Sequence, residues 1–368
     1  MTQRSTADEF YFFLGTVAEF IKLTPVMRAL RKRGRSFKII ASGQNRIVAP
    51  DLFDLAGIDR IDIALNERPI KKSPLGLIVW FAETLVKSVF ALRREFAGKR
   101  RGATVIVHGD TVSTVMGAFI GRLFGLRVAH VEAGLRSGNF FQPFPEEIDR
   151  FLTGFLADVH FCPYAIAVEN LAGRRGIKID TGYNTNIDSL ALALEYDEVP
   201  AVATAINGAK FFIFIMHRQE NLLNLDLVRS TVALIREQTK ELTCLFVMHE
   251  LTRTVLEKNN LLESLTSAPN VILTDRLPYL EFIAILRRSE FIVTDGGGNQ
   301  QETYYLGKPC FILRRVTEGT EGIGHNMTLG IDPAALRSFV RDYRQYERSM
   351  IVPAVRPSEI IINALLGE

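Results

Sequence analysis

Short apolar runs recur along the whole chain and alternate with longer stretches of helical period. Each run is continuously apolar rather than alternating, which is typical of parallel strands covered on both faces. Helical spacing of apolar residues is clearest at 18–33, 111–124 and 226–239. This rhythm predicts an α/β protein with doubly wound parallel sheets. We expect ten strands, at residues 10–14, 37–41, 104–107, 127–130, 159–162, 210–215, 245–248, 271–274, 291–294 and 310–313.

A polar segment at 196–209, which contains Pro200 and Gly208, divides the strands into two series of similar length. A chain of 368 residues is long enough for two domains. We therefore expect two Rossmann-like domains, 1–188 and 189–368, that face a central cleft. The last helix is expected to pack back on the N-terminal domain.

Composition excludes several classes of protein. With 47% hydrophobic and 23% charged residues, the chain is neither disordered nor fibrous. The 44 Lys and Arg nearly balance the 41 Asp and Glu, and no basic block stands out, which argues against a nucleic-acid partner. The longest apolar run, 73–81, is far shorter than the roughly 20 residues of a membrane helix. Asp8 and Glu9 precede the first apolar stretch, unlike the start of a signal peptide.

The three cysteines, Cys162, Cys244 and Cys310, form no CxxC pair. Cys162 and Cys310 lie in strand-like runs, which predicts buried free thiols and a reducing, cytoplasmic location. No histidine pair has metal-ligand spacing such as HExxH, and we expect no metal. His160 is interpreted as a core histidine.

Three carboxylates lie in neighbouring polar segments of the N-terminal half: Asp110 and Glu132 follow expected strands, and Glu146 lies in the next loop. Ligands of doubly wound sheets bind at the carboxyl ends of the strands. Carboxylates grouped there can hold different protonation states, as acid/base chemistry requires. The alternative is that they cap helices or pair with Arg136 and Arg150.

A glycine-rich turn stands out in the C-terminal half, where Gly296, Gly297 and Gly298 separate a strand from a helix. Bare backbone amides at a helix N-terminus suit a diphosphate, and Glu302 could accept hydrogen bonds from a ribose diol. His217, at another strand end, also suits a phosphate. The alternatives are a glycine turn without a ligand and a capped helix start. Neither GxGxxG nor GxxxxGK[ST] occurs, so no NAD or P-loop site is expected.

Together these segments resemble the non-hydrolysing UDP-N-acetylglucosamine 2-epimerase family, whose two-domain fold is shared with GT-B glycosyltransferases. The resemblance runs through nearly the whole chain. The matching segments are 15–22 with Pro25, HGDT (108–111), HVEAGLRSG (130–138), PFPEE (143–147), Thr181 to Gly182 with Asn184 and Asp188, HRQEN (217–221), TDGGGNQQE (294–302), LGKP (306–309) and TEGTE (317–321).

The resemblance implies a reaction that inverts C2 of the sugar by eliminating UDP to leave 2-acetamidoglucal and then adding it back. It implies that the enzyme needs no cofactor and that its partner is a UDP-sugar. We also expect a homodimer. The implied catalytic residues are Asp110, Glu132, Glu146 and His217, the last as a contact of the diphosphate. The uracil would lie against 276–279. The implied residues for substrate and UDP are Lys22, Arg218, Arg276, Gly296, Gly297, Gly298 and Glu302.

The chain departs from the family pattern at several positions near the phosphates. An arginine and a proline of the first motif are replaced by Val17 and Ala18. Candidates to compensate for the lost arginines are Arg218, Arg314 and Arg315. The other departures are Met216 for glycine, Gly296 for serine, Gly319 for arginine and Thr320 for proline.

Some bacterial members of the family bind a second UDP-N-acetylglucosamine as an activator. Of its motif, Gln44 is present but Asn45 and Ile47 differ, and His249 lacks the Asn-Pro that follows it in the family. Allosteric activation is therefore not expected.

Three alternatives to the 2-epimerase remain at this point. The first is a glycosyltransferase on the same scaffold, because fold does not fix function. Such an enzyme needs no base at C2, so the retained carboxylates argue against it. The others are a hydrolysing 2-epimerase that releases UDP and a non-catalytic binder of nucleotide sugars.

Overall fold

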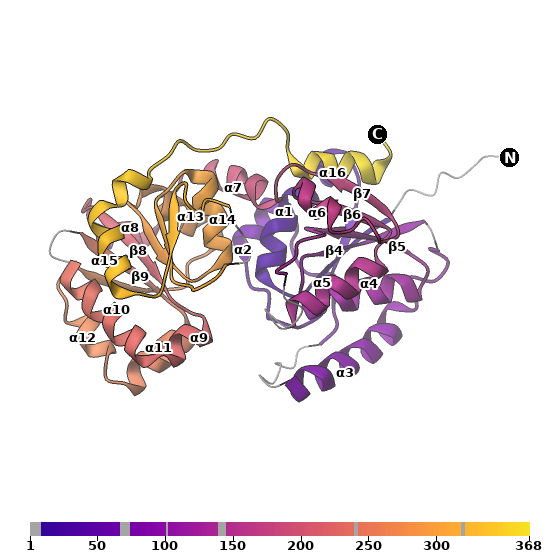
Figure 1. Cartoon of the computed structure of the whole chain (residues 1–368). Helices are drawn as coiled ribbons and strands as arrows, with labels where there is room; N and C mark the ends of the chain where they lie inside the picture. The colour runs from indigo at the N-terminus through magenta and orange to yellow at the C-terminus, as the bar shows by residue number, and fades with distance from the viewer. Residues whose placement is uncertain (1–8, 67–73, 101, 139–144, 239–241, 318–320) are drawn as a thin grey trace. The chain divides into compact units, whose positions relative to one another are not determined.

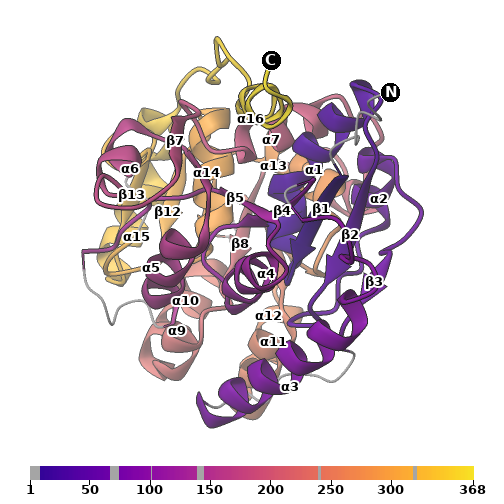
Figure 2. The same ribbon diagram turned by 90° about the vertical axis from the view of Figure 1, so that its right-hand side faces the viewer.

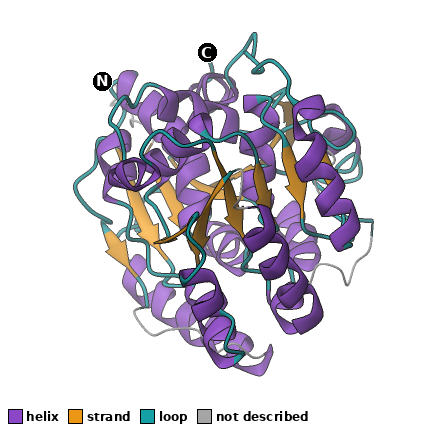
Figure 3. Cartoon of the chain, turned by 90° about the vertical axis from the view of Figure 1, so that its left-hand side faces the viewer, coloured by secondary structure: helices purple, strands orange, loops and turns teal. Residues whose placement is uncertain are grey.

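The computed structural model describes residues 9–66, 74–100, 102–138, 145–238, 242–317 and 321–368 (Figure 1). The chain forms two compact units. The N-terminal unit consists of the residues up to Ser189 together with Pro353–Glu368, and the C-terminal unit is Leu190–Val352. Each unit has one parallel β-sheet with helices around it, as Figure 3 shows in orange and purple, which confirms the expected α/β class.

The sheet of the N-terminal unit has seven strands in the order β3-β2-β1-β4-β5-β6-β7, all parallel. Helix α7 (Asn186–Leu194) begins in this unit and ends in the next. The other elements are β1 (Glu9–Leu14), α1 (Val17–Lys32), β2 (Phe37–Ala41), α2 (Pro50–Ala56), β3 (Ile63–Ala64), α3 (Pro74–Leu92), β4 (Ala103–His108), α4 (Val112–Leu123), β5 (Arg127–Val131), α5 (Glu146–Leu156), β6 (Val159–Cys162), α6 (Ala165–Glu169), β7 (Ile177–Asp180) and α16 (Pro357–Leu366).

The sheet of the C-terminal unit has six parallel strands in the order β10-β9-β8-β11-β12-β13. Its elements are α8 (Ala201–Ile206), β8 (Phe211–Ile215), α9 (Gln219–Leu223), α10 (Leu225–Gln238), β9 (Thr243–Met248), α11 (Glu250–Lys258), α12 (Leu262–Thr266), β10 (Val271–Asp275), α13 (Tyr279–Arg288), β11 (Ile292–Thr294), α14 (Gly297–Leu306), β12 (Cys310–Ile312), β13 (Met327–Leu329), α15 (Pro333–Asp342) and a 3₁₀ helix (Tyr343–Tyr346).

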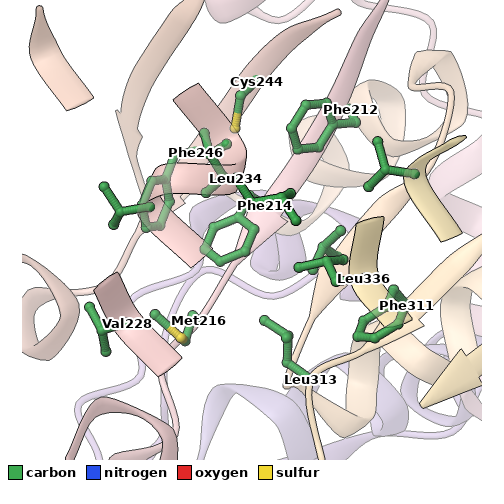
Figure 4. Close-up of a cluster of buried hydrophobic side chains, with 14 of the residues drawn as sticks. Phe212, Phe214, Met216, Val228, Leu234, Cys244, Phe246, Phe311, Leu313 and Leu336 are labelled. Atoms are coloured by element: carbon green, nitrogen blue, oxygen red, sulfur yellow. The ribbon is translucent and has the colours of Figure 1, made fainter. Parts of the chain in front are cut away.

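Both sheets are buried through their central strands, which explains the continuously apolar runs in the sequence. Strands β8 and β9 of the C-terminal unit contribute Phe212, Phe214 and Phe246 to one core cluster, and β12 contributes Phe311 (Figure 4). The three cysteines are free and buried, as expected. His160 is also buried, and its Nε2 lies 2.9 Å from the Arg175 carbonyl, consistent with a core histidine.

Helix α1 continues through Pro25, a residue that has no amide hydrogen to give to the carbonyl of Ile21. The Ser189 hydroxyl donates to that carbonyl at 2.7 Å instead. A side chain from α7 thus satisfies the acceptor that the proline leaves free, and ties α7 to α1 within the N-terminal unit.

Helix α16 packs against α1, beside the other helices of the N-terminal unit (Figure 1). Asp188 accepts from the Ser358 amide at 2.7 Å, which satisfies one of the unbonded N–H groups at the start of α16. Arg33, at the end of α1, pairs with Glu359 at 3.0 Å and with Glu368. Polar contacts at both ends therefore hold α16 in this unit.

Among the described residues, no helix is both long and apolar enough to cross a membrane.

Candidate active site

Three neighbouring strands of the N-terminal sheet, β1, β4 and β5, run parallel and end at the same edge. The turn after β1 holds Gly15 and Thr16, Asp110 follows β4, and Glu132 follows β5. The three turns therefore lie next to one another, at the edge where such sheets bind ligands.

Glu132 lies among cationic and amide groups. The Lys22 ammonium is 2.5 Å from Glu132 Oε2, the Asn184 amide donates to the same oxygen, and His108 Nε2 is 3.7 Å away. Burial raises the pKa of Glu132, but the charge of Lys22 and these contacts outweigh it and lower the pKa to about 2. The φ angle of Glu132 is +63°, a left-handed conformation that side chains rarely adopt and that is enriched at functional sites.

The pKa of Asp110 is shifted in the opposite direction. Its Oδ2 accepts from Arg150 Nη2 at 2.5 Å, and Arg150 Nη1 donates to Glu147 at 3.0 Å. Burial nevertheless outweighs the charge of Arg150 and raises the pKa of Asp110 to about 6. The environments of two neighbouring carboxyls thus move their pKa values apart, the arrangement that acid/base catalysis uses.

Glu146 is the first residue of α5, and its charge, like that of Glu132, raises the pKa of Asp110. Glu146 Oε2 is buried and has no hydrogen-bond partner among the described residues. The structure thus brings the three carboxylates that the sequence singled out within electrostatic range of one another. Residues 143 and 144 of the same motif lie outside the described residues.

Glu19 is a carboxylate of this edge that the sequence analysis missed. It accepts from the Gly15 amide at 2.5 Å, the Thr16 amide at 3.0 Å and the Thr111 hydroxyl at 2.5 Å. Burial raises its pKa to about 7. A Cβ at Gly15 would lie 2.1 Å from Ser113 Oγ, so only glycine fits between the turn and α4. The capping pattern Thr16–Glu19 was a signal that could have identified it.

In the C-terminal unit, Asp295 is fully buried after β11 and organises the strand ends around it. It accepts from the amides of His217 and Arg218, at 3.0 and 2.9 Å, and from the Asn221 side chain at 3.0 Å. His217 Nδ1 is 3.0 Å from Asp295 Oδ1. Burial would raise the pKa of Asp295, but the contacts with His217 and Arg218 lower it. Asp295 belongs to the matching segment 294–302 and directly follows an expected strand, although no role was predicted for it.

The imidazole of His217 stacks on that of His249, with ring centroids 4.5 Å apart. Burial, then the charges of His217 and Arg276, lower the pKa of His249 to about 4, so this ring is neutral at pH 7. Arg276 is exposed after β10, and its charge acts on His249. The buried Asp295 carboxylate and the neutral His249 ring therefore have three cationic or ionisable neighbours. They are His217, Arg218 and Arg276.

Helix α14 begins within the glycine run rather than after it, because Gly296 is its N-cap and Gly297 and Gly298 are its first two residues. Both of these glycines are exposed, with open space where a Cβ would stand. Glu302, one turn further on, is buried and accepts from the Asn299 side chain at 3.1 Å. The N-terminus of a ten-residue helix here suits an anion.

One departure from the family pattern, Gly296, has a physical reason in this structure. A Cβ at Gly296 would lie 2.8 Å from Asn299 Oδ1 and 3.2 Å from His217 Cε1, so a serine would require movement. Arg314, a candidate to compensate for lost arginines, is buried near α14, with Nη1 3.5 Å from Thr317 Oγ1, whereas Arg315 is exposed. Gly319 and Thr320 lie outside the described residues.

Within the described ranges, no group of three or more histidine, cysteine, aspartate or glutamate side chains could hold a metal ion. The N-terminal unit presents carboxylates and cations at one sheet edge, and the C-terminal unit presents a helix start that suits an anion. Two Rossmann-like parallel-sheet units with such sites define an enzyme of the GT-B-like fold class.

Comparison with known proteins identifies the family. The model described as UDP-N-acetylglucosamine 2-epimerase matches residues 28–345. The chain therefore belongs to the UDP-N-acetylglucosamine 2-epimerase family, as its motifs implied.

Individual relatives agree with this assignment. The UDP-N-acetylglucosamine 2-epimerase of Methanocaldococcus jannaschii is 32% identical over 330 residues, 86% of this chain and 87% of that protein. The UDP-2,3-diacetamido-2,3-dideoxy-D-glucuronate 2-epimerase of Pseudomonas aeruginosa is 35% identical over 327 residues, with the same coverage. A crystal structure of the M. jannaschii enzyme in complex with UDP-GlcNAc and UDP is 28% identical, with a TM-score of 0.79, and covers 98% of this chain and 100% of that one.

Proposed function

We propose that this enzyme is a UDP-N-acetylglucosamine 2-epimerase that interconverts UDP-GlcNAc and UDP-ManNAc, or a closely related pair. In this proposal the C-terminal unit binds UDP through the start of α14, and the N-terminal unit supplies the groups that transfer protons. The observation that supports it best is the pairing of Asp110, with a pKa near 6, and Glu132, held ionised by Lys22.

The proposed reaction has two balanced steps. A base takes the C2 proton as the bond from C1 to the UDP oxygen breaks and a C1=C2 double bond forms. An acid then returns a proton to the opposite face of C2 while the UDP oxygen bonds C1 again. A group whose pKa lies near the working pH is best suited to exchange protons, which favours Asp110, with Glu146 as the second group. Glu132 then carries a fixed negative charge beside the reacting carbons.

The binding residues have corresponding roles in this proposal. The amides of Gly296, Gly297 and Gly298 and the His217 ring contact the diphosphate, and Glu302 contacts the ribose. Lys22 and Arg218 balance the charge of the departing UDP, as Coulomb attraction favours. Arg276 lies at the uracil.

Two substrates have specific support, because the relatives include a 2-epimerase named for UDP-GlcNAc and one named for UDP-2,3-diacetamido-2,3-dideoxy-D-glucuronate. The test is to incubate the protein with each sugar nucleotide in deuterium oxide and follow C2 by NMR. We expect solvent deuterium at C2 of the true substrate and an epimeric product that still carries UDP. Release of UDP with a free sugar would indicate a hydrolysing enzyme, and an unlabelled C2 would exclude the proposal.

Replacing Glu302 with alanine should weaken UDP binding by about ten- to a hundredfold, since a hydrogen bond to a charged group is worth about 1.5–3 kcal/mol. Turnover at saturating substrate should change little, because the ribose is held alike in ground and transition states. Calorimetric titration with UDP measures the effect. Glu257→Ala, at an exposed position on α11, is the control. Equal affinities in the two variants would remove Glu302 from the UDP site.

We also propose that the protein is a homodimer through helices α3, α4 and α5, which are neighbours on one face of the N-terminal unit (Figure 2). Large apolar side chains are exposed on all three helices, more than the scattered exposure of an ordinary surface. They are Ile78, Val79, Val86 and Phe90 on α3, Phe119 and Leu123 on α4, and Leu152 and Phe155 on α5.

Replacing Phe90 with glutamate should convert the dimer to a monomer, because the side chain is 63% exposed in the single chain and a dimer would bury the new charge. Light scattering coupled to size exclusion gives the mass. Ile166→Glu, at an equally exposed position on α6, should leave the mass unchanged. A dimer that survives both substitutions would exclude this face.

We further propose that the reaction takes place in the cytoplasm. The three cysteines are free and buried, which suits a reducing compartment.

A further inference from the structure

Glu147, the second residue of α5, is a buried carboxylate to which the proposed reaction gives no role. A glutamate in the first turn of a helix is favoured by the helix dipole and is usually solvated. Glu147 is instead only 4% exposed. Burying a charge is costly unless the charge is paired and hydrogen-bonded, so its partners must account for its position.

Two arginines and one backbone amide surround the carboxylate of Glu147. Arg150 Nη1 donates to Oε2 at 3.0 Å, the Ser137 amide donates to the same oxygen at 3.1 Å, and Arg136 Nε lies 3.6 Å from Oε1. Burial lowers the pKa of Arg136, the charge of Glu147 opposes this effect, and the charge of Arg174 adds to it. Glu147 thus joins the start of α5 to the segment after β5, and its single negative charge faces two guanidinium groups.

The guanidinium of Arg150 bridges Glu147 and Asp110. Its Nη2 lies 2.5 Å from Asp110 Oδ2 while its Nη1 bonds Glu147, so one planar group holds both carboxylates. Arg150 is only 6% exposed, so water and salt screen these charges little. The N–H groups of a guanidinium have fixed relative directions, and anchoring one of them fixes the other. Glu147 therefore determines how Arg150 meets Asp110.

Other charged groups act on Asp110 from the elements around it. They are Lys22 and Glu19 of α1, Glu132 of the turn after β5, and Glu146 and Asp149 of α5. Helix α4 has one charged side chain, Arg122, at its far end, and burial lowers the pKa of His108 on β4 to about 4, so this ring is neutral. Burial raises the pKa of Asp110, and among the charges that of Arg150 has the largest effect and lowers it. A group that offsets the charge of Arg150 therefore acts on Asp110.

We infer that Glu147 is a positioning residue, which anchors Arg150 against Asp110 and offsets part of the guanidinium charge that Asp110 experiences. This inference rests on the proposed function, in which Asp110 exchanges a proton with C2 of the sugar. Without the charge of Glu147, Arg150 stabilises the ionised form of Asp110 more strongly and makes it a weaker base. Glu147 thus acts on the reaction through Arg150.

The first test is the pH profile of turnover in Glu147→Gln. Glutamine keeps an oxygen that can accept from Arg150 and from the Ser137 amide, but it carries no charge. In the wild type the acid limb should lie near pH 6, because burial raises the pKa of Asp110 to about 6. In the variant it should move to lower pH by about one unit. Turnover above the limb should fall about threefold, because a weaker base removes the C2 proton more slowly.

Calorimetry should give Glu147→Gln the UDP affinity of the wild type, because UDP is proposed to bind the C-terminal unit. A fall in turnover at every pH with an unmoved acid limb would show a merely structural role and overturn the inference. A profile identical to that of the wild type would overturn it as well.

Glu359→Gln is the matched control. Glu359 also lies 3.0 Å from an arginine of the N-terminal unit, Arg33, but both side chains are partly exposed. The substitution removes the same charge from the same kind of pair, and an exposed pair contributes little. Its turnover and acid limb should follow those of the wild type.

Glu147→Asp separates charge from reach, and it decides the question if Glu147→Gln does not fold. Aspartate keeps the charge but is one methylene shorter, so it holds Arg150 less well. Turnover should fall while the acid limb stays close to that of the wild type. An acid limb that moves to lower pH by about one unit in Glu147→Asp would overturn the role of the charge.

The second test needs no substrate. Infrared difference spectra between low and high pH detect the C=O band of protonated carboxyl groups, and the part that is missing in Asp110→Asn belongs to Asp110. The midpoint of that band should lie near pH 6 in the wild type and about one unit lower in Glu147→Gln. An unmoved midpoint would overturn the inference.

The outcomes separate this inference from the proposed function. If the wild type places no deuterium at C2 of any UDP-sugar, the proposed function fails, while the infrared titration still measures the effect of Glu147 on Asp110. If deuterium enters C2 and the midpoint does not move in Glu147→Gln, only the inference about Glu147 fails.

Discussion

Replacing Asp110 with asparagine should lower turnover by about 10²–10⁴-fold and leave UDP binding unchanged. Asparagine keeps the size of the side chain and an oxygen that can accept a hydrogen bond from Arg150. In the wild type, Arg150 Nη2 lies 2.5 Å from Asp110 Oδ2. Asparagine cannot take or return a proton. Initial rates with the UDP-sugar and calorimetry with UDP measure the two effects separately.

The same chemical change at Asp158 is the control. Asp158 also pairs with an arginine, Arg122, at 2.7 Å, and accepts from the Val128 amide at 3.0 Å. Asp158 precedes β6 and so lies at the N-terminal ends of the parallel strands, whereas Asp110 follows β4 at their C-terminal ends. Asp158→Asn should keep wild-type turnover. Equal losses in the two variants would indicate a structural effect and exclude a specific role for Asp110.

Replacing Asp295 with alanine should destabilise the C-terminal unit by about 3–5 kcal/mol, the usual cost of removing one side of a buried charged network. Asp295 is fully buried and accepts from two backbone amides and the Asn221 side chain. Its loss leaves these donors without an acceptor inside the fold. His217 also loses the carboxylate 3.0 Å from its Nδ1, so phosphate binding should weaken as well.

Denaturant unfolding followed by far-ultraviolet circular dichroism measures the loss. The only tryptophan, Trp80, is buried in the N-terminal unit, and its fluorescence provides a reference from the part that is not altered. Asp275→Asn is the control, since Asp275 is 87% exposed and its pair with Arg253 should contribute less than about 1 kcal/mol. A dichroism curve identical to that of the wild type would contradict the prediction.

All ten expected strands are present. Nine of them are largely buried, as continuous apolar runs predict for strands covered on both faces, whereas β10 is a partly exposed edge strand. The missed strands, β3, β7 and β13, are edge strands. Strand β7 is largely exposed and half polar, and β3 has two residues, so neither leaves a pattern in the sequence.

The site residues that the sequence identified are those at the ends of expected strands or in motifs. Asp110, Glu132 and the glycines of α14 belong to this set, because a polar residue directly after an apolar run is visible without coordinates. Their roles in catalysis and binding stay predictions until the variants are measured.

One carboxylate that the sequence analysis missed, Glu19, lies inside a helix. It stands among apolar positions of α1, where an acidic side chain is normally on the solvated face. Only the packing of the helix shows that this carboxyl is buried, and burial raises its pKa. Such properties depend on distances across the fold, which a linear pattern does not carry.

Helix α16 makes the order of synthesis relevant to folding. The N-terminal unit is assembled from two stretches of chain, and the ribosome makes the whole of Leu190–Val352 before it makes the second of them. Until then, Arg33 lacks Glu359 and Glu368, and Asp188 lacks the amide of Ser358. The C-terminal unit is continuous, so it is the part that can complete its core first during translation. A fragment ending at Ser189 would preserve that unfinished state, with the surface of α1 that α16 covers left open to solvent.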